Sequence, residues 1–310
     1  MVMQWEEQLA QFSSDQDMAI TIGVFDGVHL GHRHLISHLH KQAQATDCLT
    51  GVVTFQQHPH QVLSPQVQLS SLVTLEKRIT LLQRLGVALV VTLPFSHEMA
   101  QTSAHQFMLL LQKYLRMKSL VVGTDFALGK GREGNVVFLA ALGKQMGFSV
   151  HAVPPKVLDG EVVSSTIIRQ ALAQGDLQKV RKLLGRPYSL CGPVVYGAAR
   201  GRTLGFPTAN IHVNSNGAIP ANGVYVTKAY VGDKFYPSVT NVGIRPTFGQ
   251  QERTVEVYLL DTDMRLYEQE LRIDILERLR EERRFASVDE LIAQVERDVA
   301  QAREILRSEC

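Results

Sequence analysis

The sequence predicts a doubly wound α/β domain over residues 1–185, followed by a small closed β-barrel domain with a C-terminal helix over residues 186–310. Three observations support this. The length of 310 residues exceeds the usual span of one compact core. In the first half, short valine- and isoleucine-rich runs alternate with amphipathic helical patterns, which is typical of a parallel sheet with right-handed crossovers. After about residue 185, short strand-like runs follow one another without intervening helices, which is typical of a small barrel.

Five apolar runs in the first half have the length and composition of buried strands, at residues 18–25, 49–55, 87–93, 119–123 and 148–153. Helices are expected between them. One should begin at Ser103, which has capping-box spacing to Gln106. Another should run from about Thr74 to Leu85 and stop at Gly86, since glycine readily adopts the left-handed conformation that ends a helix.

The second half predicts barrel strands at residues 224–231, 236–242, 254–260 and 270–275, with the domain junction near residues 184–188. A final helix should begin at the capping box of Ser287 and Glu290. Its apolar stripe should pack against the barrel, through Leu291, Val295, Val299, Ala302, Ile305 and Leu306.

Composition narrows the function classes. Hydrophobic residues make up 45% and charged residues 20% of the chain, which excludes a disordered protein, and no run of about 18 apolar residues predicts a membrane span. The net charge of +2 gives no reason to expect a nucleic-acid partner. Cys48, Cys191 and Cys310 are too widely spaced for a zinc knuckle, and their odd number argues against a disulfide framework. With an acidic N-terminal stretch, these features predict a cytoplasmic protein; the oligomeric state stays open.

The most informative motif of the first half is residues 21–32, TIGVFDGVHLGH. An apolar strand leads through a glycine-rich turn to a helix, and ligands of open α/β sheets bind beyond such strand ends. A helix N-terminus there offers backbone N–H groups and partial positive charge to a phosphate, while Gly27 and Gly31 let the backbone approach it. His29 and His32 lie three residues apart and should point to the same side. Two histidines could also be structural or ligate a metal, although the sequence offers no convincing third ligand.

The segment GVFDGVHLGH closely resembles the HxGH signature of nucleotidylyltransferases, in the variant of the bacterial bifunctional riboflavin kinase/FMN adenylyltransferases, or FAD synthetases. The resemblance implies a nucleotidylyltransferase-like fold that joins a nucleoside triphosphate to a phosphate acceptor and releases pyrophosphate. It implies that His29 and His32 hold the ATP phosphates, and that the turn around them binds ATP through Gly23, Phe25, Asp26 and Gly27.

A second element of the first half is residues 164–169, SSTIIR. Hydroxyl groups at a helix start can bind phosphate oxygens, and a guanidinium one turn later can grip another, although helix capping alone would also explain the hydroxyls. The segment resembles the family's SSTxIR sequence, which implies that Ser164, Thr166 and Arg169 bind ATP and that Arg169 takes part in catalysis with the two histidines.

Residues 122–134 contain Gly129, Gly131 and Gly134 at the spacing of a dinucleotide-binding fingerprint. That interpretation is weak, because such a turn should follow the first strand and should precede an acidic residue about 20 positions on. The loop resembles the family's GxDFxFG segment instead, which implies nucleotide and flavin contacts for Asp125 and a flavin contact for Phe126.

The second half carries GRTLGFPTAN at residues 201–210, without a P-loop or a protein-kinase signature. Alone it could be a simple barrel turn, but the hydroxyl of Thr208 and the amide oxygen of Asn210 suit hard Mg²⁺. It resembles the riboflavin kinase PTAN motif, which implies ATP contacts from Gly201, Gly205, Thr208 and Asn210, with the last two at the metal.

Glu256 alternates with valines in a predicted strand, where a solvent-facing role would be usual. The resemblance implies instead that Glu256 is the general base for the riboflavin 5′-hydroxyl. Asn241 and Arg245 resemble the family's NxGxRPT turn, and Arg280 resembles a segment on the flavin side, so all three are implied to bind flavin.

The resemblance covers essentially the whole chain and implies an enzyme that phosphorylates riboflavin to FMN in the C-terminal domain and adenylylates FMN to FAD in the N-terminal domain. Two other functions remain open: an adenylyltransferase for another phosphorylated vitamin, and a flavin-binding sensor. The family pattern is broken at Gln56, Leu128, Ile167 and Glu268, which should affect flavin affinity more than the chemistry.

Overall fold

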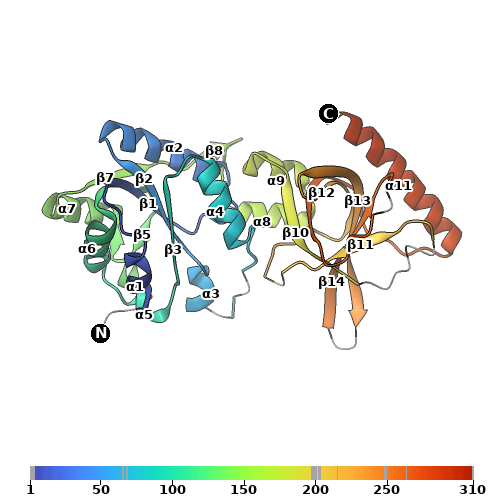
Figure 1. The fold of residues 1–310 in the computed structure, drawn as a ribbon, viewed down its shortest axis with the longest axis horizontal. Coiled ribbons are helices and arrows are strands. Elements are labelled where there is room, and N and C mark those ends of the chain that lie inside the picture. The colour runs from blue at the N-terminus through green and yellow to red at the C-terminus, as the bar shows by residue number, and fades with distance from the viewer. Residues whose placement is uncertain are drawn as a thin grey trace. The chain divides into compact units, whose positions relative to one another are not determined.

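The computed structural model describes residues 4–64, 66–67, 69–196, 201, 204–214, 216–247, 250–262 and 264–308, without the side chains of residues 245–247 and 250–252. Contacts between Cα atoms divide the chain into two compact units, Met1–Ser165 and Thr166–Cys310. Figure 1 draws the first unit in blue to green and the second in green-yellow to red.

The first unit contains a five-stranded sheet in the order β3-β2-β1-β4-β7. Its strands are β1 (Met18–Ile22), β2 (Leu49–Phe55), β3 (Leu89–Leu93), β4 (Met117–Gly123) and β7 (Ser149–Val153). Every neighbouring pair is parallel. The predicted α/β domain is therefore confirmed, with β1 ending three residues earlier and β4 beginning two residues earlier than the apolar runs indicate.

Helices cover both faces of this sheet (Figure 1). On one face, α2 (Leu30–Ala45) and α4 (Leu75–Arg84) pack against alternate strand residues such as Ala19 and Val52. On the other face, α1 (Gln4–Ala10), α6 (Ala104–Leu115) and α7 (Val136–Met146) pack against Ile20 and Val53. Neighbouring residues of one strand thus enter opposite cores, which makes the sheet doubly wound. The shorter elements of this unit are α3 (Pro59–Leu63), α5 (His97–Ala100), β5 (Ala127–Leu128), a 3₁₀ turn (Lys130–Arg132), β6 (Gly134–Asn135), β8 (Val157–Leu158) and β9 (Glu161–Val162).

Two predicted helix boundaries are confirmed by their caps. The Ser103 side chain accepts a hydrogen bond from the backbone N–H of Gln106 (3.1 Å) at the start of α6. Thr74 caps α4, and Gly86 follows that helix with a φ of +81°, a conformation that glycine adopts without strain.

The second unit contains the predicted closed barrel, in the order β10-β11-β14-β13-β12-β15, with all neighbouring pairs antiparallel. Its strands are β10 (Tyr188–Val195), β11 (Thr208–Ile211), β12 (Gly223–Val231), β13 (Lys234–Thr247), β14 (Gln250–Leu259) and β15 (Glu270–Arg280). Sequence patterns predicted only the last four. The strand β10 was missed because it contains Gly192 and Pro193, which are typical of turns. The strand β11 was missed because it is only four residues long.

Within the described part of this unit, the helices α8 (Ser165–Gln174), α9 (Leu177–Leu184) and α11 (Val288–Ser308) lie beside the barrel in the chain order. Ala302 and Leu306 of the predicted stripe are buried on α11 and pack against Val224, Val226 and Val239 of the barrel. The C-terminal helix therefore covers part of the outer barrel surface, as predicted.

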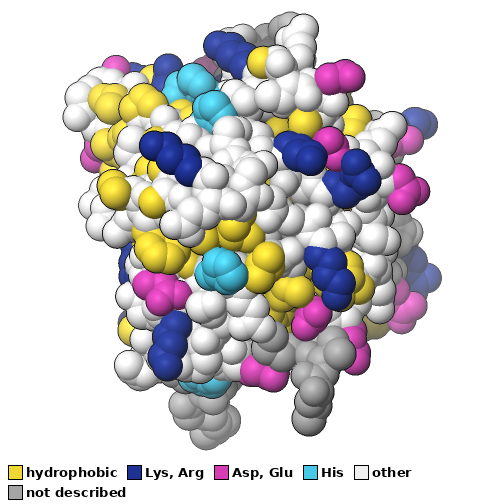
Figure 2. Space-filling model, turned by 90° about the vertical axis from the view of Figure 1, so that its left-hand side faces the viewer, with side chains coloured by type: hydrophobic (Ala, Val, Ile, Leu, Met, Phe, Trp, Pro, Cys, Tyr) yellow, Lys and Arg dark blue, Asp and Glu magenta, His cyan; other side chains and the backbone are white. Residues whose placement is uncertain are grey.

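Among the described residues, no helix combines the length and the hydrophobicity needed to cross a bilayer. On the face drawn in Figure 2, lysine and arginine side chains are interspersed with aspartate and glutamate side chains.

Candidate active sites

The first candidate site lies where the strand order of the parallel sheet reverses. The chain passes from β1 outward to β2 and β3, then returns to place β4 on the other side of β1. The loops after β1 and β4 therefore leave the same edge in opposite directions, and ligands of open α/β sheets bind in the crevice at such a point. The predicted HxGH segment follows β1, and the predicted Asp125 loop follows β4.

The turn between β1 and α2 is tightly wound. Phe25, Gly27 and Val28 all have positive φ values, of 53°, 83° and 41°. For phenylalanine and valine this conformation is strained, and it persists only where the surroundings enforce it. Here the Phe25 and Val28 side chains are buried in the core beneath α2, and Gly23 donates its N–H to Val53 O (3.0 Å).

The two histidines lie face to face at the N-terminus of α2. His29 is the N-cap residue, and its Nδ1 accepts a hydrogen bond from the backbone N–H of His32 (3.3 Å). The two imidazole rings are stacked, with centroids 3.7 Å apart and an interplanar angle of 17°. The predicted convergence of the two histidines on one side of the turn is therefore observed.

Gly31 is required by this packing. A Cβ atom at residue 31 would lie 2.9 Å from His29 Cε1 and 2.9 Å from Val163 O. The glycine between the two histidines therefore lets the backbone of residue 163 approach the first turn of α2.

The surroundings of His32 favour its neutral form. Its Nδ1 is buried and, within the described part of the chain, has no hydrogen-bond partner. Burial, together with the nearby positive charges of His29 and Arg78, holds the pKa of His32 well below its ordinary value of 6.5. His32 can therefore offer a ring N–H to an anion without itself carrying a charge.

Asp26 ties the turn to the segment before α4. Its buried carboxylate accepts hydrogen bonds from the backbone N–H groups of Leu72 (2.9 and 3.0 Å) and Val73 (3.3 Å). The backbone carbonyl of Asp26 accepts a hydrogen bond from the Ser165 hydroxyl (2.9 Å). Sequence patterns named the neighbouring Ser164 and missed Ser165, because nothing in the local pattern distinguishes two consecutive serines at a helix start.

Ser164 immediately precedes α8, and Thr166 and Arg169 lie on that helix. Thr166 is exposed and Arg169 is half-buried. Asp125 is exposed just after β4, where a Cβ at Gly123 would lie 2.9 Å from Asp125 Oδ1. Phe126 is half-buried and packs against the core of the first unit.

The glycines at 129 and 134 have a packing role. Added Cβ atoms there would lie 2.7 Å from Ala104 N and 2.6 Å from Ala104 Cβ, respectively. Glu133 accepts a hydrogen bond from the same Ala104 N–H (2.8 Å), so the loop is fixed against the N-terminus of α6. Contact with a helix thus explains two of the three glycines in the spacing that mimics a dinucleotide fingerprint, Gly129 and Gly134.

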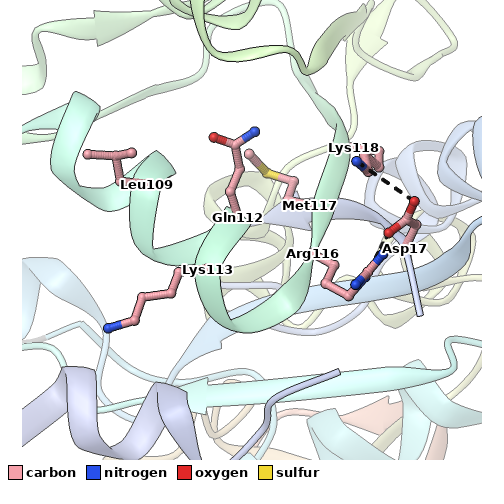
Figure 3. A pocket seen from close by; sticks show the side chains of 7 residues that line it. All are labelled: Asp17, Leu109, Gln112, Lys113, Arg116, Met117 and Lys118. Atoms are coloured by element: carbon pink, nitrogen blue, oxygen red, sulfur yellow. Dashed lines mark hydrogen bonds and ion pairs between the residues drawn. The ribbon is translucent and has the colours of Figure 1, made fainter. Parts of the chain in front are cut away.

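A cavity of about 500 Å³ lies at the opposite edge of the sheet, where β1 and β4 begin. Figure 3 shows Asp17 between Arg116 and Lys118, with ion-pair distances of 2.8 and 3.9 Å. This cavity is at the amino ends of the strands, so it is separate from the candidate site at their carboxyl ends.

The second candidate site is a polar row across three barrel strands. Asn210 on β11 is directly opposite Glu256 on β14, which is directly opposite Asn241 on β13. Directly opposed residues in antiparallel strands share a face, with Cβ atoms about 4.5–5.5 Å apart. Val255 and Val257 are buried, so strand alternation places Glu256 and both asparagines on the outer face of the barrel.

Thr208 extends this face by one row. It pairs with Tyr258, whose ring meets Phe206 edge-on with centroids 5.6 Å apart. A Cβ at Gly201 would lie 2.4 Å from Phe206 O and 3.3 Å from Thr208 Oγ1, so the backbone before the strand closes tightly onto it. Gly205 has a φ of +86°, which the turn requires. Residues 197–200, 202 and 203 of this segment lie outside the described residues.

The Arg280 side chain forms an ion pair within the protein. Its Nε donates to both carboxylate oxygens of Asp298 (3.1 and 3.0 Å), and its Nη2 lies 2.8 Å from Oδ2. Asp298 is buried on α11, so this ion pair joins the last barrel strand to the C-terminal helix. The side chain of Arg245 lies outside the described residues.

The surroundings of His29 and His32 do not support metal binding by these two histidines. Within the described ranges, no group of three or more histidine, cysteine, aspartate or glutamate side chains could hold a metal ion.

Comparisons with known proteins match both units. A family model described as FAD synthetase matches residues 11–167, and one described as riboflavin kinase matches residues 184–306. The bifunctional riboflavin kinase/FMN adenylyltransferase of Escherichia coli strain K12 is 38% identical over 287 residues, which are 92% of this chain and 91% of the relative. That of Haemophilus influenzae is 36% identical over 295 residues, covering 94% and 96%. A crystal structure named as a macrolide-efflux protein from Streptococcus pneumoniae has the same fold, with a TM-score of 0.87, 31% identity, and 95% of this chain and 96% of that chain covered.

Proposed function

The chain belongs to the bifunctional riboflavin kinase/FMN adenylyltransferase family, and on that premise we propose which of its residues carry each reaction. The C-terminal part phosphorylates riboflavin to FMN with ATP, and the N-terminal part adenylylates FMN to FAD and releases pyrophosphate. The boundary between the two parts is proposed to follow residue 185. This is supported by Gly185, which ends α9 in the left-handed conformation, and by the riboflavin kinase match, which begins at residue 184.

In the adenylyltransferase site, a phosphate oxygen of FMN bonds to the α-phosphorus of ATP as the bond from that phosphorus to the bridging oxygen of pyrophosphate breaks. The attacking phosphate is already ionised near neutral pH, so the protein's task is positional and electrostatic. His29, His32 and the N-terminus of α2 are proposed to bind the ATP phosphates, with Arg169 as a further cation. The stacked histidines at the switch point of the sheet support this assignment.

The end of β4 is proposed to supply the other half of this site. Asp125 and Phe126 would contact the nucleotide and the flavin, and Ser164 and Thr166 would bind the triphosphate. The position of β4 directly beside β1 supports a shared site for the loops that follow these two strands.

In the kinase site, Glu256 is proposed to accept the proton of the riboflavin 5′-hydroxyl. The hydroxyl oxygen bonds to the γ-phosphorus of ATP as the bond from that phosphorus to the β,γ-bridging oxygen breaks, which yields FMN and ADP. A positioned general base contributes about 10²- to 10⁴-fold to such a step. The single observation that carries this proposal is the row Asn210–Glu256–Asn241, which places the carboxylate between two amides on one barrel face. Asn241 is proposed to contact riboflavin, whereas a direct flavin contact by Arg280 gains no support, since its guanidinium is bound to Asp298.

The hydroxyl and amide oxygens beside Glu256 fit Mg²⁺, which prefers oxygen ligands. Water and phosphate oxygens would complete its coordination. Thr208 and Asn210 would hold the ion through a hydroxyl and an amide oxygen. When bound, Mg²⁺ neutralises negative charge on the ATP phosphates. The cytoplasm is the proposed compartment, which the free thiol of Cys48 supports.

One experiment separates the two assignments. Purified protein is incubated with Mg-ATP and either riboflavin or FMN, and riboflavin, FMN and FAD are resolved by chromatography. His32→Ala should convert riboflavin to FMN and stop there. Glu256→Gln should form little FMN from riboflavin but should still convert supplied FMN to FAD. If His32→Ala instead lost FMN formation and kept FAD formation, the assignment of reactions to the two units would be reversed.

A further inference from the structure

Arg78 on α4 is an unusual buried cation behind the adenylyltransferase site. The residue is only 4% exposed, and its Nε is buried without a hydrogen-bond partner within the described part of the chain. A guanidinium stays charged in proteins, and burying a charge is costly unless it is paired and hydrogen-bonded. Burial lowers the pKa of Arg78, and the charges of Asp26 and Glu76 oppose that effect.

The contacts of Arg78 lead to the HxGH turn from one side. Its Nη1 donates to Phe55 O (2.8 Å) and to Thr54 Oγ1 (3.3 Å), at the carboxyl end of β2. The Thr54 hydroxyl in turn donates to Val24 O (3.0 Å) in the turn after β1. The guanidinium therefore supports the turn through one intervening hydroxyl group.

The same helix is attached to the turn from the other side. The Asp26 carboxylate holds the backbone N–H groups of Leu72 and Val73, which directly precede the N-cap of α4. Arg78 lies one helical turn later, with its N–H bonded to Thr74 O (3.0 Å). The hydrogen bonds form a closed circuit from Val24 through β2 and α4 and back to Asp26, two residues further along the same turn.

We propose that Arg78 is a positioning residue of the adenylyltransferase site, which fixes the turn between β1 and α2 and adds a buried positive charge next to that turn. This inference rests on the proposed function, because it assumes that His29 and His32 bind the ATP phosphates. The orphaned Nε supports a role beyond packing, since a cation needed only to fill space would be better replaced by an apolar side chain. The charge also acts on His32, because Arg78 contributes to the lowered pKa of that histidine.

The test compares Arg78→Met, which removes the charge and both hydrogen bonds, with Arg78→Lys, which keeps the charge and one donor group. Arg84→Met is the matched control, because Arg84 is exposed near the end of the same helix. FMN is supplied directly and initial rates of FAD formation are measured against ATP concentration. Riboflavin phosphorylation by the same samples is the internal reference.

Folding of the first unit is monitored separately. Trp5 is the one tryptophan of the sequence and is buried in the core of that unit, so its fluorescence reports on that unit's fold. In samples with native Trp5 fluorescence, Arg78→Met should raise the KM for ATP in FAD formation about tenfold, which corresponds to about 1.4 kcal/mol. Arg78→Lys should recover most of this loss, and Arg84→Met should behave as the wild type.

The hydroxyl bridge gives a second variant that spares the buried cation. Thr54→Val should raise the same KM, and combining it with Arg78→Met should add less than the sum of the two effects, because both residues act through Val24. A wild-type KM in folded Arg78→Met, or a loss that only follows the fraction of unfolded protein, would overturn the inference. His32→Ala identifies the other failure: if that variant still forms FAD, the proposed site itself is wrong.

Discussion

Replacing Gly31 with alanine tests the geometry of the HxGH turn with a single added methyl group. The new Cβ would lie 2.9 Å from both His29 Cε1 and Val163 O, whereas ordinary contacts begin at 3.4 Å, so a neighbour must move by about 3.4 − 2.9 = 0.5 Å. The backbone carbonyl cannot rotate away freely. The His29 ring is buried and stacked on His32, so the displacement should fall on the histidine pair.

A misplacement of about 1 Å in a catalytic group can cost about 100-fold in rate. Half that displacement in Gly31→Ala should therefore lower kcat/KM for FAD formation by about ten- to hundredfold. Helix propensity works in the opposite direction, because alanine favours the helical conformation more than glycine does. A loss of activity therefore cannot be attributed to a weaker helix.

The assay supplies FMN and Mg-ATP and follows FAD, with riboflavin phosphorylation measured on the same sample. Riboflavin phosphorylation should be unchanged, because Glu256 and its neighbours lie in the other unit. Ser37→Ala on the exposed side of α2 is the control and should leave both rates unchanged. Wild-type FAD formation in Gly31→Ala would show that the close approach of residues 29, 31 and 163 is not part of the active geometry.

Three further predictions concern stability. Arg280→Met leaves the buried Asp298 carboxylate without its ion pair and should lower the free energy of unfolding of the second unit by about 3–5 kcal/mol, as measured by urea denaturation followed by far-UV circular dichroism; an unchanged midpoint would contradict this. Glu133→Ala removes the acceptor for Ala104 N–H and should lower the free energy of unfolding of the first unit by about 1 kcal/mol, as measured by Trp5 fluorescence. A loss of FAD formation in protein that is still folded would instead assign the loop a different role. Because the pKa of His32 is lowered in the folded state, the unfolded chain binds more protons below pH 6.5. The first unit should therefore lose stability as pH falls through 6.5 towards the lower folded-state pKa. In melting curves recorded against pH, His32→Asn should flatten that decline, and an unchanged slope would refute the burial argument.

The elements of the first unit were largely predictable because their patterns are local. Strands such as β2 are continuous apolar runs, as expected for a sheet covered on both faces, and the cap at Ser103 follows from a four-residue pattern. The position of β4 beside β1 was not predictable from such patterns, because strand order depends on the path of the crossovers. That order alone brings the Asp125 loop to the same edge as the histidines.

The residues that sequence reasoning missed are those that act through other parts of the fold. Arg78 resembles a surface charge on an amphipathic helix, yet it lies three residues after Leu75 and four before the buried Leu82, on the apolar stripe. A cation at that position was the available signal. Ser165, whose hydroxyl donates to Asp26 O, had no such signal, since its neighbour Ser164 has the same chemistry.

The sequence by itself determined the two-part organisation, the HxGH turn with its required glycine, and the presence of a threonine, an asparagine and a glutamate suited to phosphoryl transfer, because each depends on residues close together in the chain. Tertiary structure decided which of them meet. Asn210, Asn241 and Glu256 become neighbours only through barrel register, and a shift of one residue would turn Glu256 towards the core. The support of the HxGH turn by Arg78 likewise exists only because α4 folds back onto the end of β2, a contact between segments that no local pattern connects.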